Sequence, residues 1–196
     1  MSIDVRAVVE FALELDKLKG VTRKVKPLGL DRYENSAEHS WQLALLAFSL
    51  APHADPDIDL DRTIKMLLVH DIGEIDTGDT IAFLEHGWEE RKAAELAAVN
   101  RIFGLLPQTQ TMELLALWRE FEDGTTAEAR FANAVDRAMP VLLNLANDGQ
   151  SWRENRISYE RVVARVRAPI EAGCPALWAH IDARLQEARR QGWFGI

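Results

Sequence analysis

The sequence predicts an all-α fold. Apolar residues recur at three- and four-residue steps through most of the chain, which is the pattern of helices with one buried face. A sustained alternation of apolar and polar residues, as expected for strands, occurs nowhere in the sequence. The 196 residues are 47% hydrophobic, which is enough to bury one core. We therefore expect a single domain over residues 1–196, with a core at about 15–150 and C-terminal helices at about 158–191.

The overall charge and composition restrict the classes of partner. A net charge of -8 and a pI near 5.2 argue against a nucleic-acid polymer, because phosphate backbones are bound by many cationic side chains. The apolar runs are much shorter than the roughly 20 residues that cross a bilayer, and acids stand near the N-terminus where a secretion signal carries bases. The single cysteine, Cys174, cannot form an internal disulfide and fits a reducing compartment. We expect a cytoplasmic protein with no membrane partner.

The first predicted helix covers residues 4–18 and ends at Gly20. A basic segment follows, with Lys and Arg residues between Lys17 and Arg32 in a chain that is otherwise acidic. Two interpretations stay open: a solvated charged loop, or a clamp for a phosphate group. Arg suits a clamp better than Lys because its planar guanidinium holds two oxygens at once.

The second predicted helix begins at an N-cap, Ser36, and ends before Pro52. It is largely apolar, and His39 lies in its first turn. A histidine on an apolar helix can be a hydrogen-bonded core residue as well as a metal ligand, so His39 alone decides nothing.

The third predicted helix leads into the stretch around which the chain is organised. Its apolar face ends at His70 and Asp71, and Glu74 follows one turn later in an acidic turn that contains Gly73 and runs to Asp79. Imidazole and carboxylate together suit a divalent transition ion, and a further carboxylate could move a proton without binding that ion. The alternative is a capping Asp beside a hydrogen-bonded core His.

The rest of the chain also reads as helices. A helix is expected at Trp88–Phe103 with Ala93, Leu96, Ala97 and Ile102 inward, and the other three histidines are expected to be exposed or structural. The further helices are expected at about Met112–Phe121, after the capping-box spacing of Thr125 and Glu128, at about Tyr159–Val166 and at about Ala176–Gln191.

Asp136 lies beside the apolar stripe of the helix that follows Thr125 and Glu128. A buried unpaired carboxylate is costly, so Asp136 needs a base, backbone donors or a metal ion. Arg137 points about 100° away around the helix and is not the expected partner. Pro140, four residues later, removes the amide that would bond to the carbonyl of Asp136 and predicts a local kink.

His39, the pair His70 and Asp71, and Asp136 thus lie on or at the end of three different predicted helices. Two imidazoles and two carboxylates leave about two positions of an octahedral ion for water and substrate, as metal-assisted hydrolysis requires. The order His, His-Asp, Asp on helices resembles the HD-domain metal-dependent phosphohydrolases.

Within that superfamily the chain resembles the 5'-deoxynucleotidase group over roughly residues 15–150. The resemblance rests on Arg23 and on several blocks: Glu34–Trp41, His70–Glu74 with Gly78-Asp79, Leu117–Glu122, Thr126–Ala129 and Val135-Asp136. Ile75 departs from the Asp that guanosine-tetraphosphate hydrolases carry directly after the Glu. Lys24 stands where bacterial deoxynucleotidases often have Trp, so the resemblance gives no base or sugar preference.

The resemblance implies a single HD-domain helical bundle that removes phosphate from deoxyribonucleoside 5'-monophosphates. It implies one divalent ion (Mn, Co, Fe, Ni or Mg), a small-molecule nucleotide as substrate, and a homodimer. The implied metal ligands are His39, His70, Asp71 and Asp136; Glu74 would be the acid/base, Arg23 a phosphate contact and Asp79 a residue near the sugar. The alternatives are an HD phosphohydrolase that acts on another nucleotide, and a nucleotide-binding sensor without turnover.

Overall fold

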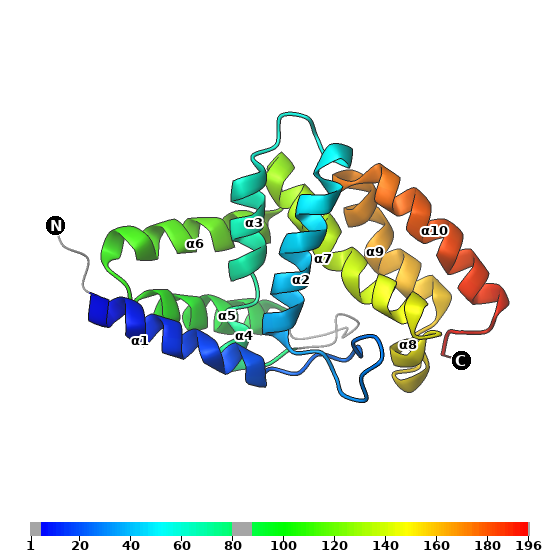
Figure 1. Cartoon of the computed structure of the whole chain (residues 1–196), viewed down its shortest axis with the longest axis horizontal. Coiled ribbons are helices and arrows are strands. Elements are labelled where there is room, and N and C mark those ends of the chain that lie inside the picture. Colours follow the sequence, from blue (N-terminus) through cyan, green and yellow to red (C-terminus); the bar gives the residue numbers. More distant parts are fainter. Residues whose placement is uncertain (1–4, 80–87, 196) are drawn as a thin grey trace.

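The computed structural model describes residues 5–79 and 88–195, and these ranges are helical without a β-strand (Figure 1). One isolated antiparallel bridge pairs Thr22 with Asn35. None of the described helices has the length and apolar composition needed to cross a membrane. The helices are α1 (Val5–Leu15), η1 (Asp16–Gly20), α2 (Ser36–Leu50), η2 (Ala51–His53), α3 (Leu60–Val69), α4 (Glu74–Thr77), α5 (Trp88–Phe103), α6 (Gln108–Asp123), α7 (Ala127–Ala146), α8 (Gln150–Glu154), α9 (Tyr159–Gly173) and α10 (Pro175–Arg190).

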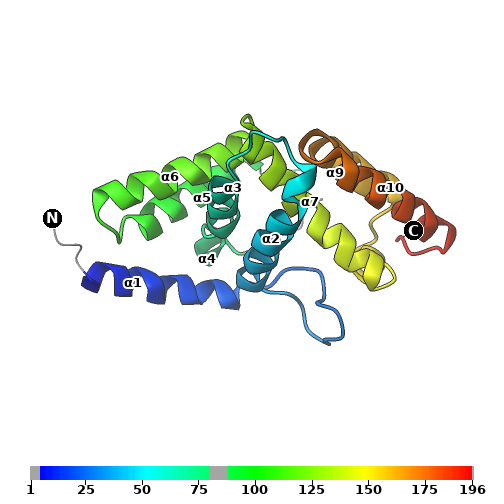
Figure 2. The ribbon, with the colours of Figure 1, turned by 45° about the horizontal axis from the view of Figure 1, so that its top comes forward.

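Helix α7 is the central element of the core. It packs against α2, α3 and α6 and also against α9 and α10. In Figures 1 and 2 it runs through the middle of the molecule, with α9 and α10 beyond it and α1, α5 and α6 at the other end. Buried residues occur around most of its circumference, as expected for a helix enclosed by others. Asp136 lies within this buried stretch.

Two helix caps differ from the sequence prediction. Asn35, and not Ser36, is the N-cap of α2, and it forms a capping box with Glu38. Ser36 is buried, and its hydroxyl is used elsewhere. Helix α7 is capped by Thr126, whose hydroxyl accepts from the amide of Ala129.

Several helix boundaries and faces also differ. The α5 prediction is right in its bounds, but its inward face is Ala98, Val99, Ile102 and Phe103, whereas Leu96 is 37% exposed. Ala93 and Ala97 are exposed as well. Helix α6 begins earlier than predicted, and α9 continues through Pro169 to Gly173, packed along α7. Helix α7 likewise continues through Pro140.

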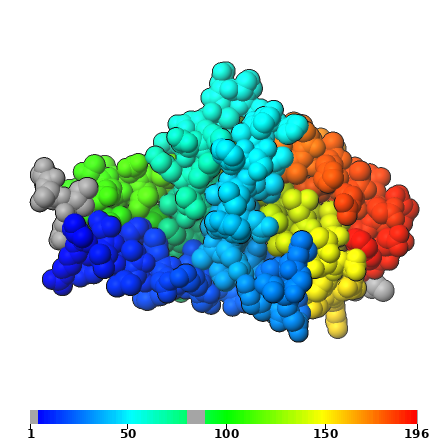
Figure 3. Space-filling model, in the orientation of Figure 1, coloured from blue at the N-terminus to red at the C-terminus, as the bar shows by residue number. Residues whose placement is uncertain are grey.

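His53 and His180 are exposed, as predicted, while the prediction for His86 lies outside the described residues. Helix α2 crosses the middle of the face shown in Figure 3. Three large apolar side chains on this helix are exposed: Trp41, Leu45 and Phe48.

Two glycines allow a close approach of backbones near the site. A Cβ at Gly73 would lie 3.2 Å from the carbonyl oxygen of Glu95, so α5 packs directly over the turn that follows α3. A Cβ at Gly173 would lie 2.1 Å from the carbonyl oxygen of Arg130, so this position has no room for a side chain. Gly173 therefore fixes the contact between the end of α9 and the start of α7.

Candidate metal site

Three buried side chains from three helices converge at the centre of the molecule. His39 is in the first turn of α2, His70 is the C-cap of α3, and Asp136 is in the middle of α7. One possible ligand atom from each lies within 4.8 Å of the other two, and the three side chains form the metal-binding cluster found among the described residues. Asp136 Oδ1 is 3.2 Å from His39 Nε2 and 3.7 Å from His70 Nε2.

The other nitrogen of each imidazole faces an oxygen atom of the protein. Nδ1 of His70 is 2.8 Å from the carbonyl oxygen of Leu67, which can only accept, so Nδ1 carries the proton. Nδ1 of His39 is 3.2 Å from Oε2 of the buried Glu34, which is within ion-pair distance but without hydrogen-bond geometry. A carboxylate or carbonyl behind a histidine fixes its tautomer and directs the far nitrogen to a metal ion. Both histidines thus present Nε2 to Asp136.

The surroundings of His70 Nε2 fit a divalent cation. This buried atom has no partner of hydrogen-bond geometry among the described residues, although oxygens of Asp71 and Asp136 lie 3.1 and 3.7 Å away. Burial opposes a charge on the ring, but these two carboxylates outweigh it and raise the pKa of His70 well above its usual value. The carboxylates therefore favour a positive charge at Nε2, either a proton or a metal ion.

Asp71 borders the cluster without lying inside the group of three. Its Oδ1 is 3.1 Å from His70 Nε2, and its Oδ2 accepts a 2.8 Å hydrogen bond from Arg23 Nη1. Burial opposes ionisation, yet the charges of His70 and Arg23 lower the pKa of Asp71 to about 2. The carboxylate is thus ionised and turns one oxygen toward the cluster.

Glu74 opens α4 one turn after Asp71, and it is buried. Ser36 donates a 2.7 Å hydrogen bond to its Oε2. Burial and the charge of Asp71 raise the pKa of Glu74 to about 9, so this carboxyl group holds a proton at neutral pH. A protonated carboxyl beside the cluster can act as a general acid.

Arg23 lies among carboxylates. Apart from Asp71, its guanidinium is 3.6 Å from Glu34 Oε2 and 3.9 Å from Asp79 Oδ1. Backbone hydrogen bonds from Arg23 N to Glu34 O and from Glu34 N to Val25 O, each 2.8 Å, bring the two sides of this loop together. Burial disfavours the guanidinium charge, but the neighbouring carboxylates raise the pKa of Arg23 above its usual value. For Asp79, burial and the charge of Asp71 raise the pKa.

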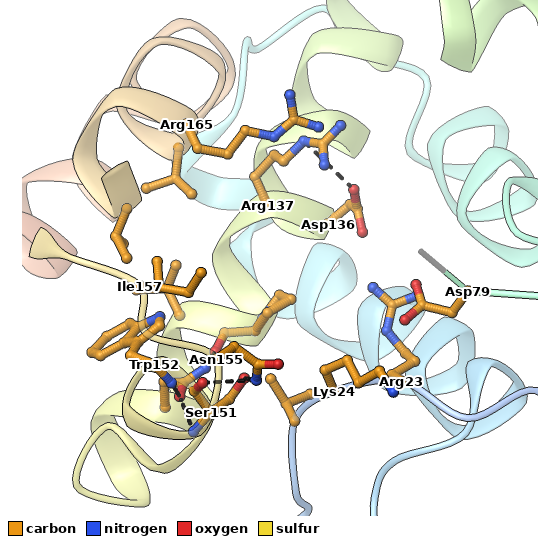
Figure 4. A pocket seen from close by; sticks show the side chains of 16 residues that line it. Arg23, Lys24, Asp79, Asp136, Arg137, Ser151, Trp152, Asn155, Ile157 and Arg165 are labelled. Carbon is orange, nitrogen blue, oxygen red and sulfur yellow. Dashed lines mark hydrogen bonds and ion pairs between the residues drawn. The ribbon is translucent and has the colours of Figure 1, made fainter. Parts of the chain in front are cut away.

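Two cavities meet at the cluster. The larger, of about 400 Å³, is lined by the charged residues around His70 and reaches Arg91 and Glu122. The smaller, of about 120 Å³, lies between α7, α8 and α9, and its surface is mainly apolar, with Trp152 and Ile157 among the lining residues, although polar and charged side chains also line it (Figure 4). The two cavities share five lining residues: Arg23, Asp79, Asp136, Arg137 and Arg165.

The structure adds residues that the sequence interpretation did not assign. Glu34 lies in one of the blocks of resemblance, but its position behind His39 depends on how the loop folds back. Arg137 was not the expected partner of Asp136, yet its Nε is 4.0 Å from Asp136 Oδ2 because the long side chain bends back along α7. Arg165, on α9, also lines the site, and it belongs to no sequence motif that could have predicted this position.

Together these features define a helical protein with a buried group of His and Asp side chains that could hold a metal ion. A family model described as HD domain matches residues 15–178, so the chain belongs to the HD domain family. The expected family and the all-α fold are therefore confirmed.

Known relatives and one solved structure are similar to this chain. The 5'-deoxynucleotidase HDDC2 of Xenopus laevis is 28% identical over 80% of this chain and 80% of that protein. The 5'-deoxynucleotidase HDDC2 of Homo sapiens is 30% identical over 70% of this chain and 66% of that protein. A crystal structure described as a predicted metal-dependent phosphohydrolase from Magnetospirillum magnetotacticum MS-1 superimposes with a TM-score of 0.92 and 41% identity, covering 98% of this chain and 96% of that one. The resemblance to the deoxynucleotidase group is confirmed by these relatives.

Proposed function

We propose that this protein is a metal-dependent phosphohydrolase that converts deoxyribonucleoside 5'-monophosphates to deoxynucleoside and phosphate. The observation that carries the proposal is the convergence of His39, His70 and Asp136 beside the buried carboxyl group of Glu74. The names of the relatives support the choice of substrate.

The proposed ligands of one divalent ion are His39, His70, Asp71 and Asp136. The ion would polarise the phosphoryl group and activate water. Mixed nitrogen and oxygen ligands suit Mn, Co, Fe, Ni or Mg, and availability decides among them. If the ion remains at full occupancy in both His39→Ala and Asp136→Ala by elemental analysis, this ligand set is wrong.

The protein groups divide the remaining work. Glu74 would give its proton to the leaving 5'-oxygen, for which its raised pKa suits it. Arg23 would use the N–H groups not bonded to Asp71 for the phosphate. Asp79, which lines both cavities, would lie near the sugar, and the apolar cavity beside it would take the base.

The experiment is a panel of phosphate-release assays with added Mn or Co. It uses ribo- and deoxyribonucleoside mono-, di- and triphosphates. We expect turnover of deoxyribonucleoside monophosphates, above that of the matched ribonucleotides. A preference for a triphosphate would assign another phosphohydrolase branch. Tight nucleotide binding without turnover under every metal would make the protein a sensor.

A homodimer and a cytoplasmic location are part of the same proposal. Trp41, Leu45 and Phe48 lie at helical spacing on one face of α2 and are 62%, 49% and 63% exposed. An apolar face of this kind is typical of an interface. Light scattering at micromolar concentration should give a dimer that Phe48→Glu dissociates, while Leu13→Glu, on the exposed face of α1, leaves it intact. A wild-type monomer would contradict the dimer alone.

A further inference from the structure

Several carboxylates lie at the cluster, and each of them opposes the binding of a negatively charged phosphate. Asp71, Asp79, Glu34 and Asp136 all lie within or beside the site, and three of them surround Arg23. A phosphate monoester carries about two negative charges at neutral pH, since its second pKa is about 6. Arg23 is already hydrogen-bonded to the carboxylate of Asp71, and its single positive charge is surrounded by three negative charges. Further positive charge at the cluster would favour binding of such a dianion.

A second group of positive charge lies at the same cluster, on helices that do not carry Arg23. Arg137 projects from α7 and Arg165 from α9, and Figure 4 shows the guanidinium of Arg137 turned toward Asp136 and that of Arg165 next to it. Both residues line the polar cavity and the apolar cavity at the place where the two meet. The side chain of Arg137 is 30% exposed and reaches Asp136 only at the 4.0 Å limit of an ion pair.

Two like charges held close together cost free energy unless something of opposite charge joins them. Burial and the charge of Arg137 lower the pKa of Arg165, as expected for a buried guanidinium with a second one nearby. Asp136 offsets part of this repulsion, but the same carboxylate faces His39 and His70. Both arginines line the cavities beside this carboxylate, so an anion bound where the cavities meet would lie against the two guanidinium groups.

The spacing of the two arginines is fixed by the backbone. Helices α7 and α9 form the most extensive helix contact in the described chain. Gly173 seats the end of α9 directly on the carbonyl of Arg130, a contact that no larger residue allows. The two guanidinium groups therefore project from a rigid pair of helices, as a preorganised binding site requires.

We propose that Arg137 and Arg165 together bind the phosphate group of the substrate, beside the cluster and on a different wall of the site from Arg23. The identity of the substrate in this inference rests on the proposed phosphohydrolase function. The binding itself does not, because the two arginines would recognise any tetrahedral oxyanion such as phosphate. Each guanidinium offers a planar pair of N–H donors to two phosphate oxygens.

The test measures binding of inorganic phosphate to the Mn-loaded protein by isothermal titration calorimetry. The variants are Arg137→Gln, Arg165→Gln and the double substitution. The matched control is Arg167→Gln, which removes one positive charge from the exposed face of the same helix. Each single variant should raise the Kd for phosphate by about tenfold or more, the usual effect of a lost hydrogen bond to a charged group. Arg167→Gln should stay within about twofold, as expected for an exposed charge.

Two further readouts separate phosphate binding from a structural role. The Kd for Mn, measured by chelator competition, should be unchanged in Arg137→Gln and Arg165→Gln. Arg165→Lys keeps the charge without the fork and should recover only part of the phosphate affinity. Loss of metal binding in step with phosphate binding would overturn the proposal, and so would variants that bind phosphate as Arg167→Gln does. A wild-type protein that does not bind phosphate would overturn it too.

The outcome is distinguishable from that of the functional proposal. If the wild-type protein hydrolyses no nucleoside monophosphate but binds phosphate through the two arginines, the proposed function fails and this inference stands. If it hydrolyses the nucleotide with a KM that neither variant changes, the inference fails and the function stands.

Discussion

Arg23 and Asp71, 48 residues apart in sequence, are joined by a 2.8 Å hydrogen bond from Nη1 to Oδ2. Arg23 therefore touches a proposed metal ligand as well as the place proposed for the phosphate. Because the bond fixes the direction of the free oxygen of Asp71, the two roles cannot be separated by a simple deletion.

Arg23→Ala should weaken metal binding by about tenfold in addition to raising KM, since loss of a ligand's hydrogen-bond partner costs about 10- to 100-fold in affinity. Chelator competition measures the first effect and steady-state kinetics the second. Lys19→Ala, an exposed basic residue paired with Asp16, serves as the control and should change neither. An unchanged metal affinity in Arg23→Ala would contradict a role of Arg23 in metal binding and would leave only its proposed role in phosphate binding.

Glu74→Gln should lower kcat by roughly a hundredfold or more while the metal stays bound, the usual scale for a lost general acid or base. The substitution keeps the size of the side chain and its contact with Ser36. Stopped assays give kcat, and elemental analysis gives the occupancy of the ion. A normal kcat in Glu74→Gln would rule out the acid role of Glu74 without contradicting the proposed metal ligands.

Glu34→Ala should weaken metal binding about 10- to 100-fold, because the carboxylate behind Nδ1 of His39 orients the ring and raises its basicity. Glu34→Gln retains an acceptor and should lie between this variant and the wild type. Glu113→Gln, at an exposed position of α6, is the control. Equal metal affinity in all four proteins would show that Glu34 is a packing residue only.

The metal-free protein should lose stability as the pH rises from about 5 to 9. Glu74 has a pKa of about 9 in the folded protein and an ordinary value of 4.5, so the folded state binds the extra proton between these limits. Raising the pH removes that proton from a buried group and favours unfolding. The raised pKa of His70 acts in the same direction above its ordinary 6.5.

Thermal denaturation in chelator at several pH values measures this effect. Glu74→Gln should show a shallower decline of Tm with pH than the wild type, because the amide does not titrate. Parallel curves for the two proteins would contradict the assignment of a proton to Glu74.

Gly73→Ala should destabilise the fold by about 1–3 kcal/mol, the usual cost of inserting a methyl group into a packed contact. The new Cβ would meet the carbonyl oxygen of Glu95 at 3.2 Å and Val99 Cγ1 at 3.3 Å. Gly20→Ala is a matched control, since its Cβ meets nothing within 4 Å. Equal Tm values for the two variants would show that α5 adjusts freely over the turn.

Much of this arrangement could be predicted from the chain alone. Helical periodicity located the helices, and the residue types His39, His70, Asp71 and Asp136 indicated the site, of which three members form the described cluster. The prediction that His70 lies at the C-terminal end of the third helix is also confirmed, since His70 is the C-cap of α3.

What could not be predicted depends on contacts between distant segments. Glu34 acts on His39 because the preceding loop pairs with itself, and periodicity says nothing about such pairing. Arg137 was not the expected partner because of its angle around the helix, which ignores the reach of a long and flexible side chain. The inward face of α5 was wrong for a similar reason: it is chosen by neighbouring helices, and alanines offer too weak a preference.

The proposed ligands bring together segments that lie far apart in sequence. His39 and Asp136 are 97 residues apart, and His70 lies between them on a third helix. An ion held by all three would be a removable cross-link through the middle of the fold. Binding only the folded state, it would add about 4 kcal/mol of stability when free ion exceeds its Kd a thousandfold. The lifetime of the protein would then follow the supply of metal in its surroundings, and a chelator would shorten that lifetime as well as stop turnover.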